Sequence, residues 1–551
     1  MTTGTLRTPP AAAPLGERAD HVVRGFVARR TVRGGLLWGV VIGAYVASSA
    51  FGYTTLGSTD AERARVLTGF AANPGLAALV GRPDDITTVA GFVDWRTTGI
   101  GALVVAVWGL MAGTRVLRGE EAAGRWELLV SGRTTRRGAT VDALAGLGAA
   151  LAALFAGTAV LTAAVGTSSD IRIGVGPALL FAVTITLAAA TFVGVAALAS
   201  QLLATRGQAA GLSLGVFGAA FALRAVGDAA PQVSWLSALS PFGWVERVHA
   251  IAAPDPLWLV PLVALVTLLV AATVALADRD IGAAVLGDRD RASARLGLLG
   301  GPLPLAVRLT RSTSAAWLLG AAALGALYGS VSGAAAEAFA QSDILQRFGT
   351  AFTTQARIEG AKLFAGVVFL VLMTVGMGCA ANAAGAIRHE EAQGLVENLL
   401  VRRLGRARWL AGRAALAAVV VVLVPLAGAV GYLLTARSVN GPGAGTVFVA
   451  GLNAAAPGLL LLGLAVLTFA LAPRATGRVA YGLLAWSFLL EMLASAVDVP
   501  DLVRDTSLLH HVALAPAVAV SWGPVVLYLA LAVLATAVGV RGFARRDLAG
   551  E

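Results

Sequence analysis

Residues 118–137 read RGEEAAGRWELLVSGRTTRR, and residues 388–408 read RHEEAQGLVENLLVRRLGRAR. Both stretches carry two adjacent glutamates, a glycine and a third glutamate in the same register, so that Arg388 repeats Arg118 at an offset of 270 positions. A spacing close to half of the 551-residue chain indicates a duplicated unit. The function of the motif therefore depends on what the duplicated unit is.

The composition is that of a membrane protein. Hydrophobic residues make up 57% of the chain and charged residues 13%, and the mean hydropathy is +0.78. Twelve apolar stretches of about 20 residues are long enough to cross a bilayer as helices. They lie near 35–52, 98–117, 141–165, 175–203, 208–228, 257–277, 313–333, 363–386, 410–435, 446–472, 476–497 and 522–541. We predict an all-α polytopic membrane protein with about 12 transmembrane helices.

Positive charge predicts the orientation of these helices. With the N-terminus inside, most of the 42 lysines and arginines fall in cytoplasmic segments, as the positive-inside rule requires. Both termini and both copies of the motif are then cytoplasmic. The first 34 residues are polar and contain arginines, which argues against a cleaved signal peptide. The arginines are scattered through short loops, so the positive charge favours contact with membrane lipids, and no nucleic-acid partner is expected.

The repeat extends beyond the motif. ADRDIGA at 277–283 matches ARRDLAG at 544–550, each directly after the last predicted span of a half. Six spans per half is an even number, so the two halves are predicted to be parallel six-helix repeats around an axis along the membrane normal. The predicted organisation is a cytoplasmic leader, a first half, a cytoplasmic linker and a second half. Their ranges are 1–34, 35–283, 284–307 and 308–551.

The chain lacks the residues of a metal, redox or nucleotide site. Cys379 is the only cysteine, and His510 and His511 are interpreted as loop residues because ligand spacing and carboxylate partners are missing. Lys362 is the only lysine and lies outside any G-x-x-x-x-G-K-[ST] pattern. We therefore expect no metal and no cofactor bound by this chain, and an ATPase, if there is one, on another polypeptide.

Residues 119–131 have the pattern of a short amphipathic helix, with Glu120 and Glu121 near its start and arginines beyond its end. Such a helix either lies on the lipid headgroups or docks onto a partner. Two copies in register, on the same predicted loop of each half, favour a docking element for a two-fold symmetric partner.

These residues resemble the membrane permease subunit of a type-2 ATP-binding-cassette exporter, in particular the fused twelve-span exporters of polyketide antibiotics (tetronasin-type) in actinomycetes. The resemblance is carried by EEAAGRWELLVSGRTTRR (120–137), EEAQGLVENLL (390–400), SPFGW (240–244) and the DRDIG and RRDLAG endings. It covers essentially the whole chain. The second motif departs from the pattern, because it has Asn398 in place of Leu128 and no tryptophan at position 396.

The resemblance implies a transport subunit without its own catalytic site. It would lie in the bacterial plasma membrane and export lipophilic compounds such as antibiotics, drugs or lipids, giving multidrug efflux and antibiotic resistance. Two copies of a separate ATPase, which hold ATP and Mg, would bind the two cytoplasmic coupling helices. The implied coupling residues are Glu120, Glu121, Gly124, Trp126, Glu127 and Leu129, and in the second copy Glu390, Glu391, Gly394, Glu397 and Leu399.

Two other function classes stay open at this point. A proton-coupled secondary multidrug transporter needs a titratable carboxylate within a span, and Glu491 is the clear example. A membrane-embedded transferase needs paired carboxylates near one face, and the Glu120–Glu121 type of pair is the candidate. Neither class explains why the cytoplasmic motif occurs twice.

Two charges lie in predicted spans at equivalent places of the repeat. Arg224 and Glu491 share the offset of 267 positions that also relates the RDI and RDL endings. By the resemblance, the fifth span of each half lines the pathway, and we predict that the two charges meet as an outer gate. The alternative is that each side chain reaches water separately at the membrane surface. The same helical faces add Phe217, Phe221, Leu484 and Phe488 as pathway residues.

The outward stretch 231–256 keeps Trp235, Leu239, Phe242 and Trp244 among its prolines. This pattern fits short interfacial or re-entrant helices that cap the pathway, and equally an aromatic belt that anchors the adjacent spans.

Overall fold

A computed structural model describes most of the chain. The described residues are 22–54, 80–83, 86–130, 135–168, 171–229, 231–280, 283–286, 297–298, 301–330, 332–333, 336, 359–401, 404–436, 441–494 and 500–546. Residues 1–21 of the predicted leader, and residues 287–296 and 299–300 of the predicted linker, lie outside this set.

The chain divides into two compact units, Met1–Ala292 and Ser293–Glu551. In the first, the helices are α2 (Val22–Thr54), α5 (Val89–Thr114), η1 (Arg115–Gly119), α6 (Glu120–Ala122), α7 (Arg125–Val130), α8 (Arg136–Gly166), α9 (Val175–Leu202), α10 (Arg206–Ala229), η2 (Pro231–Leu239), α11 (Pro241–Arg247), η3 (Pro256–Trp258) and α12 (Leu259–Ala275). In the second they are α13 (Pro302–Ser330), α16 (Gly360–Ala392), α17 (Leu395–Leu400), α18 (Arg406–Thr435), α19 (Ala444–Leu471), η4 (Pro473–Ala475), α20 (Thr476–Ala494), α21 (Asp501–Arg504) and α22 (Trp522–Arg545).

The protein is an all-α multi-pass membrane protein. Ten of the described helices are long and apolar enough to cross a membrane, and each coincides with one of the predicted spans. The two other predicted spans, near 313–333 and 476–497, are also helical, as α13 and α20, but are not among the ten. Arginines at the start of α13, and Arg478 and Glu491 in α20, make these two helices less apolar.

In the first unit the long helices pack around α9 and α5. α2 packs on α8, α5 on α9 and α12 on α9, while α10 lies against α9 and α5. About half of the buried residues of α5, α8 and α9 are alanine or glycine, which lets the backbones of neighbouring helices approach closely. The packing leaves a wide face of α10 exposed, including Leu212, Leu214, Val216 and Val226.

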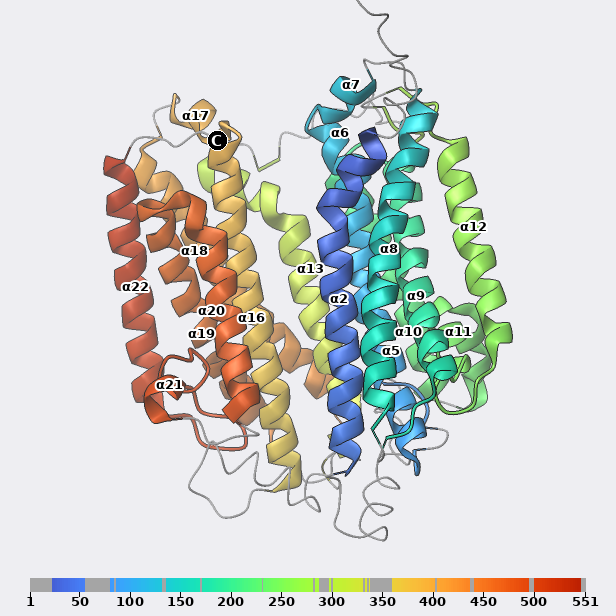
Figure 1. The fold of residues 1–551 in the computed structure, drawn as a ribbon. Helices are drawn as coiled ribbons and strands as arrows, with labels where there is room; N and C mark the ends of the chain where they lie inside the picture. The colour runs from blue at the N-terminus through green and yellow to red at the C-terminus, as the bar shows by residue number, and fades with distance from the viewer. Residues whose placement is uncertain are drawn as a thin grey trace, which may run out of the picture. The chain divides into compact units, whose positions relative to one another are not determined.

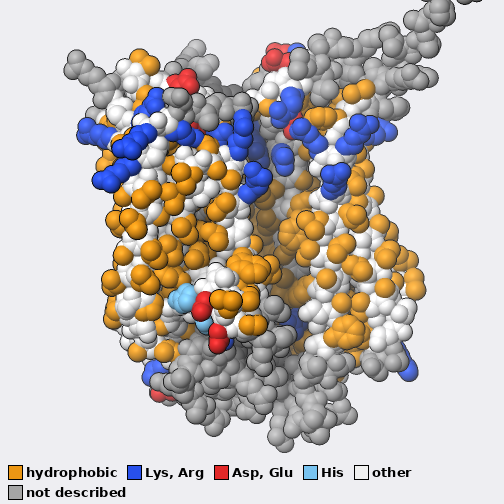
Figure 2. All heavy atoms as spheres, turned by 60° about the vertical axis from the view of Figure 1, so that its left-hand side comes forward, with side chains coloured by type: hydrophobic (Ala, Val, Ile, Leu, Met, Phe, Trp, Pro, Cys, Tyr) orange, Lys and Arg blue, Asp and Glu red, His pale blue; other side chains and the backbone are white. Residues whose placement is uncertain are grey.

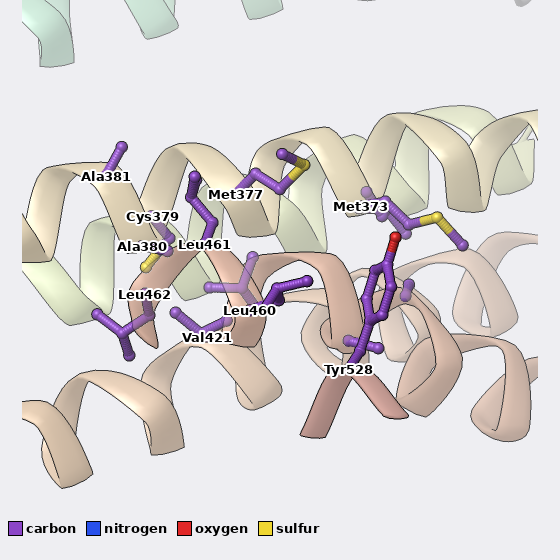
Figure 3. Packing of buried hydrophobic residues seen from close by; sticks show 14 of the residues in the cluster. Met373, Met377, Cys379, Ala380, Ala381, Val421, Leu460, Leu461, Leu462 and Tyr528 are labelled. Atoms are coloured by element: carbon purple, nitrogen blue, oxygen red, sulfur yellow. The ribbon is translucent and has the colours of Figure 1, made fainter. Parts of the chain in front are cut away.

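The second unit packs its helices in the corresponding order. α13 packs on α18, α16 on α19 and α22 on α19, and α20 lies against α16 and α19. Figure 3 shows the centre of this core, where Met373, Met377 and Cys379 of α16 face Leu460 to Leu462 of α19 and Val421 of α18. Cys379 is 4% exposed and unbridged.

Short helices cover the ends of each bundle (Figure 1). In the first unit α6 and α7 lie at one end and α11 at the other; in the second, α17 and α21 lie at opposite ends. In the face shown by Figure 2, lysine and arginine side chains gather toward the end that carries α7 or α17, and hydrophobic side chains cover the middle. This distribution fits the expected cytoplasmic position of the motif.

The expected short helices of the stretch 231–256 are present as η2 and α11. Trp244 Nε1 donates to the carbonyl of Ala238 at 2.7 Å, and Phe242 is buried, whereas Trp235 and Leu239 are exposed. One side of η2 and α11 therefore packs on the helix bundle, and the other side is exposed.

Candidate functional site

The first motif lies where α5 ends and the chain turns toward α8. α5 continues through the π-helical turn η1 into α6, the backbone turns at Gly124 with φ +71°, and α7 follows. In the second motif α16 runs to Ala392, Gly394 has φ +69°, and α17 follows. A positive φ is costly for residues with a Cβ, so the turn favours glycine at both positions. The prediction of one continuous helix over 119–131 is wrong for this reason.

The second glutamate of the first motif is buried in an ion-pair network. Arg279 Nη1 and Nη2 donate to Glu121 Oε1 and Oε2 at 2.9 and 2.8 Å, and Arg118 Nη1 donates to Oε2 at 2.8 Å. The Glu121 side chain is 7% exposed. Arg279 belongs to the DRDIG ending, so the two repeated sequence signatures of this half bind each other.

The second unit has a corresponding network, in which the arginine donates through one nitrogen only within the described part of the chain. Arg546 Nη2 donates to Glu391 Oε1 at 2.5 Å, and Arg388 Nη1 donates to Oε2 at 3.3 Å. The Glu391 side chain is 1% exposed. Arg546 belongs to the RRDLAG ending and holds the place that Arg279 holds in the first half.

The start of the following span binds the same segment. Arg136 Nη1 donates to the carbonyl oxygen of Arg279 at 3.3 Å and to Asp280 Oδ1 at 2.7 Å. In the second unit Arg406 Nη1 donates to the carbonyl oxygen of Arg546 at 2.7 Å. Both ends of each motif loop are therefore tied to the segment that comes after the sixth helix.

The first glutamate of each motif is also engaged, but with different partners. Glu120 pairs with Arg30 of α2 at 2.9 Å and with Arg125 of α7, and it is 6% exposed. Glu390 pairs with Arg413 of α18. These pairs join the motif to the first helix in one unit and to the third in the other.

The third glutamate is different, because Glu127 and Glu397 are both exposed. The predicted coupling carboxylates thus fall into two groups. The adjacent pair is turned inward and fixes the loop, while the third carboxylate faces outward from α7 or α17.

The apolar residues of the motif face inward to different degrees. Trp126 is half-buried, and its Nε1 donates to the carbonyl of Val116 at 3.4 Å. Val396, which stands where the first copy has tryptophan, is 1% exposed, and Leu399 packs partly against the same core. The side chain of Leu129 lies outside the described residues.

At the opposite end of the first unit, Arg224 is buried, with 1% of its surface exposed. It pairs with Glu246 of α11 and with Asp228, whose Oδ2 lies 3.7 Å from Arg224 Nε, and its guanidinium lies 5.1 Å from the Phe221 ring centre. Burial raises the pKa of Glu246 to about 8, although the Arg224 charge opposes the shift. Separate access of Arg224 to water does not fit this burial.

A cavity of about 390 Å³ lies beside this pair, and the charged side chains of Arg82, Asp94 and Arg247 form part of its lining. Hydrogen bonds connect the lining residues. Arg82 donates to the carbonyls of Gly227 and Asp228 at the end of α10. Arg247 donates to Ser237 Oγ at 3.0 Å, and Asp94 accepts from Thr98 at 2.7 Å. Arg82 therefore joins the segment before α5 to the end of α10, and Arg247 joins α11 to η2.

Glu491 is likewise buried, with 3% of its surface exposed. Its partner within the second unit is Ser507, whose Oγ donates to Glu491 Oε1 at 2.9 Å. Arg224 and Glu491 thus each have a partner in their own unit. A contact between them would join the two units and stays a prediction.

The four apolar residues predicted for the pathway are not equivalent. Phe217 packs edge-on against Phe192 and Phe242, with ring centres 5.5 and 5.4 Å apart. Phe221 packs under Arg224, Leu484 is half-buried, and Phe488 is 42% exposed. Phe217 joins α10 to α9 and α11, whereas Phe488 presents a free aromatic surface.

Among the described residues, no group of three or more histidine, cysteine, aspartate or glutamate side chains could hold a metal ion. The sequence interpretation missed the partners Arg279, Arg546 and Glu246. For the two arginines, the available signal was the equal register of the RDI and RDL endings, which also mark the repeat.

Comparison with known sequences adds one relative and one family. Over 564 aligned positions the chain is 29% identical to the multidrug efflux system permease protein Rv1217c of Mycobacterium tuberculosis (strain ATCC 25618 / H37Rv), covering 98% of each chain. The family model described as multidrug efflux system permease Rv1217c, C-terminal domain, matches residues 25–277 and 299–544, most of both units. The chain therefore belongs to the family of the multidrug efflux system permease Rv1217c.

Proposed function

We propose that the chain is the membrane permease of an ATP-driven exporter of lipophilic compounds, in the bacterial plasma membrane with both termini cytoplasmic. Two copies of a separate ATPase would bind residues 120–130 and 390–400, here called the docking loops. The observation that carries the proposal is the duplicated loop itself, with a left-handed glycine, an inward glutamate pair and an outward glutamate in each copy.

The remaining support comes from the chain as a whole. The relative in Mycobacterium tuberculosis is named a multidrug efflux system permease, which favours export of several lipophilic compounds. The missing P-loop favours a separate partner as the subunit that holds ATP and Mg. The corresponding packing of the two units supports a parallel repeat of six helices each, with α13 and α20 as the spans that complete twelve.

The proposal is tested by purifying the full chain with a candidate ATP-binding-cassette ATPase from the same genome. We expect a stable complex with two ATPase copies and an increase in ATP turnover on adding ethidium, a lipophilic fluorescent probe. Ethidium transport in membrane vesicles should require ATP on the side of the membrane that carries the ATPase. It should persist when the proton gradient is collapsed.

One observation favours a second candidate, a proton-coupled transporter. The Glu246 carboxyl is buried beside the cavity of the first unit, and burial raises its pKa to about 8. Export that stops on collapse of the proton gradient and continues without ATP would support this alternative and overturn the first proposal.

A further inference from the structure

Each docking loop is connected to its unit at two places, one through the chain and one through an ion pair. By chain connectivity it comes after α5 or α16. Through Arg279 or Arg546 it is also bound to the segment directly after α12 or α22, the sixth helix of each unit. The same non-local contact occurs in both units.

The geometry of the contact is that of a strong ion pair. Arg279 approaches both oxygens of Glu121 with two nitrogens, the fork arrangement that adds direction as well as strength. All four side chains in the two pairs are at most 19% exposed, so water screens these contacts little.

The arginines also contact the fourth helix of their unit. Arg279 Nε donates to Gln201 Oε1 of α9 at 2.7 Å. The Arg546 guanidinium lies 5.3 Å from the ring centre of Phe469 in α19 and 5.4 Å from that of Phe543 in α22. One side chain therefore links the docking loop with the ends of the fourth and sixth helices.

We infer that Arg279 and Arg546 are positioning residues that pass movement of the docking loops to the fourth and sixth helices. The inference rests on the proposed function, since only a loop that meets a moving partner has movement to pass on. Without the arginine, a loop would still be connected to α5 or α16, and its exposed glutamate would still be available to a partner. Docking should therefore survive while coupling is lost.

The contact itself can be tested without the ATPase. Hydrogen exchange of the full chain in lipid nanodiscs should show that Arg279→Ala speeds amide exchange about tenfold in residues 115–127 and leaves 388–400 unchanged, because one charge-assisted contact is lost. Arg546→Ala should do the reverse. Arg545 is the exposed neighbour of Arg546, and Arg545→Ala is the matched control expected to change neither loop. Equal protection in all variants would overturn the inference.

Transmission is tested with the ATPase present. Arg279→Ala and Arg546→Ala should reduce ethidium-stimulated ATP turnover about tenfold, while the amount of ATPase retained stays within about twofold. Exchanging the charges, as Glu121→Arg with Arg279→Glu, should restore part of the stimulation, which a variant that is merely misfolded would not do.

The two possible failures give different results. If the wild-type chain neither retains the ATPase nor stimulates it, the proposed function is wrong. The inferred role of Arg279 and Arg546 in passing on movement is then wrong as well. If the wild type is stimulated and both arginine variants are stimulated equally, the proposed function stands and the positioning role is wrong.

Discussion

Arg279 and Glu121 lie 158 positions apart in the sequence, and the guanidinium donates to both carboxylate oxygens, at 2.9 and 2.8 Å. Glu391 and Arg546, 155 positions apart, form the corresponding contact. The adjacent glutamates of the motif are therefore internal anchors. The third glutamate of each motif, in the short helix after the left-handed glycine, is exposed instead.

The exposed glutamates should act in docking alone. Glu127→Ala combined with Glu397→Ala should weaken ATPase association about tenfold, because exposed charge-assisted contacts are lost, and should leave thermal unfolding unchanged. Co-purification and a thermal melt measure the two quantities. Asp278→Ala, which removes an exposed carboxylate at the same end, is the control. A lowered melting temperature in the double variant would contradict the assignment.

The glycines at the turns should not tolerate a side chain. Gly124→Ala and Gly394→Ala each force an alanine into a left-handed conformation, at a cost of about 1–2 kcal/mol. The strain should appear as faster hydrogen exchange confined to the affected loop and as weaker ATPase binding. Gly148 lies within α8 with open space around it, so Gly148→Ala should be neutral or slightly stabilising. Wild-type exchange in both loop variants would be the contrary result.

Glu246 should make stability depend on pH. Its pKa is raised from an ordinary 4.5 to about 8, so the folded state holds the proton more tightly than the unfolded state. The contribution of Glu246 to stability is then fully present below about pH 4.5 and is lost as the pH rises through about 8, by at most about 1.4 kcal/mol per unit. Melting curves from pH 5 to 9 in detergent should show the decline, and Glu246→Gln should flatten it.

The exposed Glu359 provides the comparison, and Glu359→Gln should keep the wild-type profile. A Glu246→Gln chain with an unchanged pH dependence would show that another group is responsible.

Charge exchange should identify the partner of Arg224. Arg224→Glu alone should impair export, because it leaves a buried carboxylate beside Glu246. Adding Glu246→Arg should recover much of the activity if the pair within the first unit matters, whereas adding Glu491→Arg should recover it if the predicted gate exists. Ethidium export by the three variants decides between the two partners.

Alanine substitutions of Phe217 and Phe488 should have different effects, the first on stability and the second on transport. Phe217→Ala removes a ring packed between α9 and α11 and should destabilise the chain by about 3 kcal/mol. Phe488 is 42% exposed, so Phe488→Ala should leave the melting temperature nearly unchanged and alter the range of exported compounds. Equal melting temperatures of the two variants would contradict this difference.

The sequence predicted the features that depend on local apolar content. Ten predicted spans are apolar helices in the structure, because about 20 apolar residues leave few alternatives in a bilayer. α13 and α20 are helical but not among the ten, and Arg478 and Glu491 interrupt the apolar run of α20. Their assignment as spans stays a prediction.

The motif loop was harder to predict, because its shape depends on one torsion and on distant partners. Residues 119–131 have helical periodicity, but glycine allows a left-handed turn that the periodicity does not reveal. The partner of Glu121 comes from beyond α12, after four intervening long helices. Only the recurrence of RD after the last span of each half pointed to it.

Cys379 gives the chain a practical property. It is the only thiol among 551 residues, and it is enclosed between α16 and α19 in the core drawn in Figure 3. A buried thiol reacts poorly with maleimides. A cysteine introduced at position 127 or 397 would therefore accept a fluorophore or spin label selectively in the otherwise natural sequence, and each loop could be observed separately during turnover.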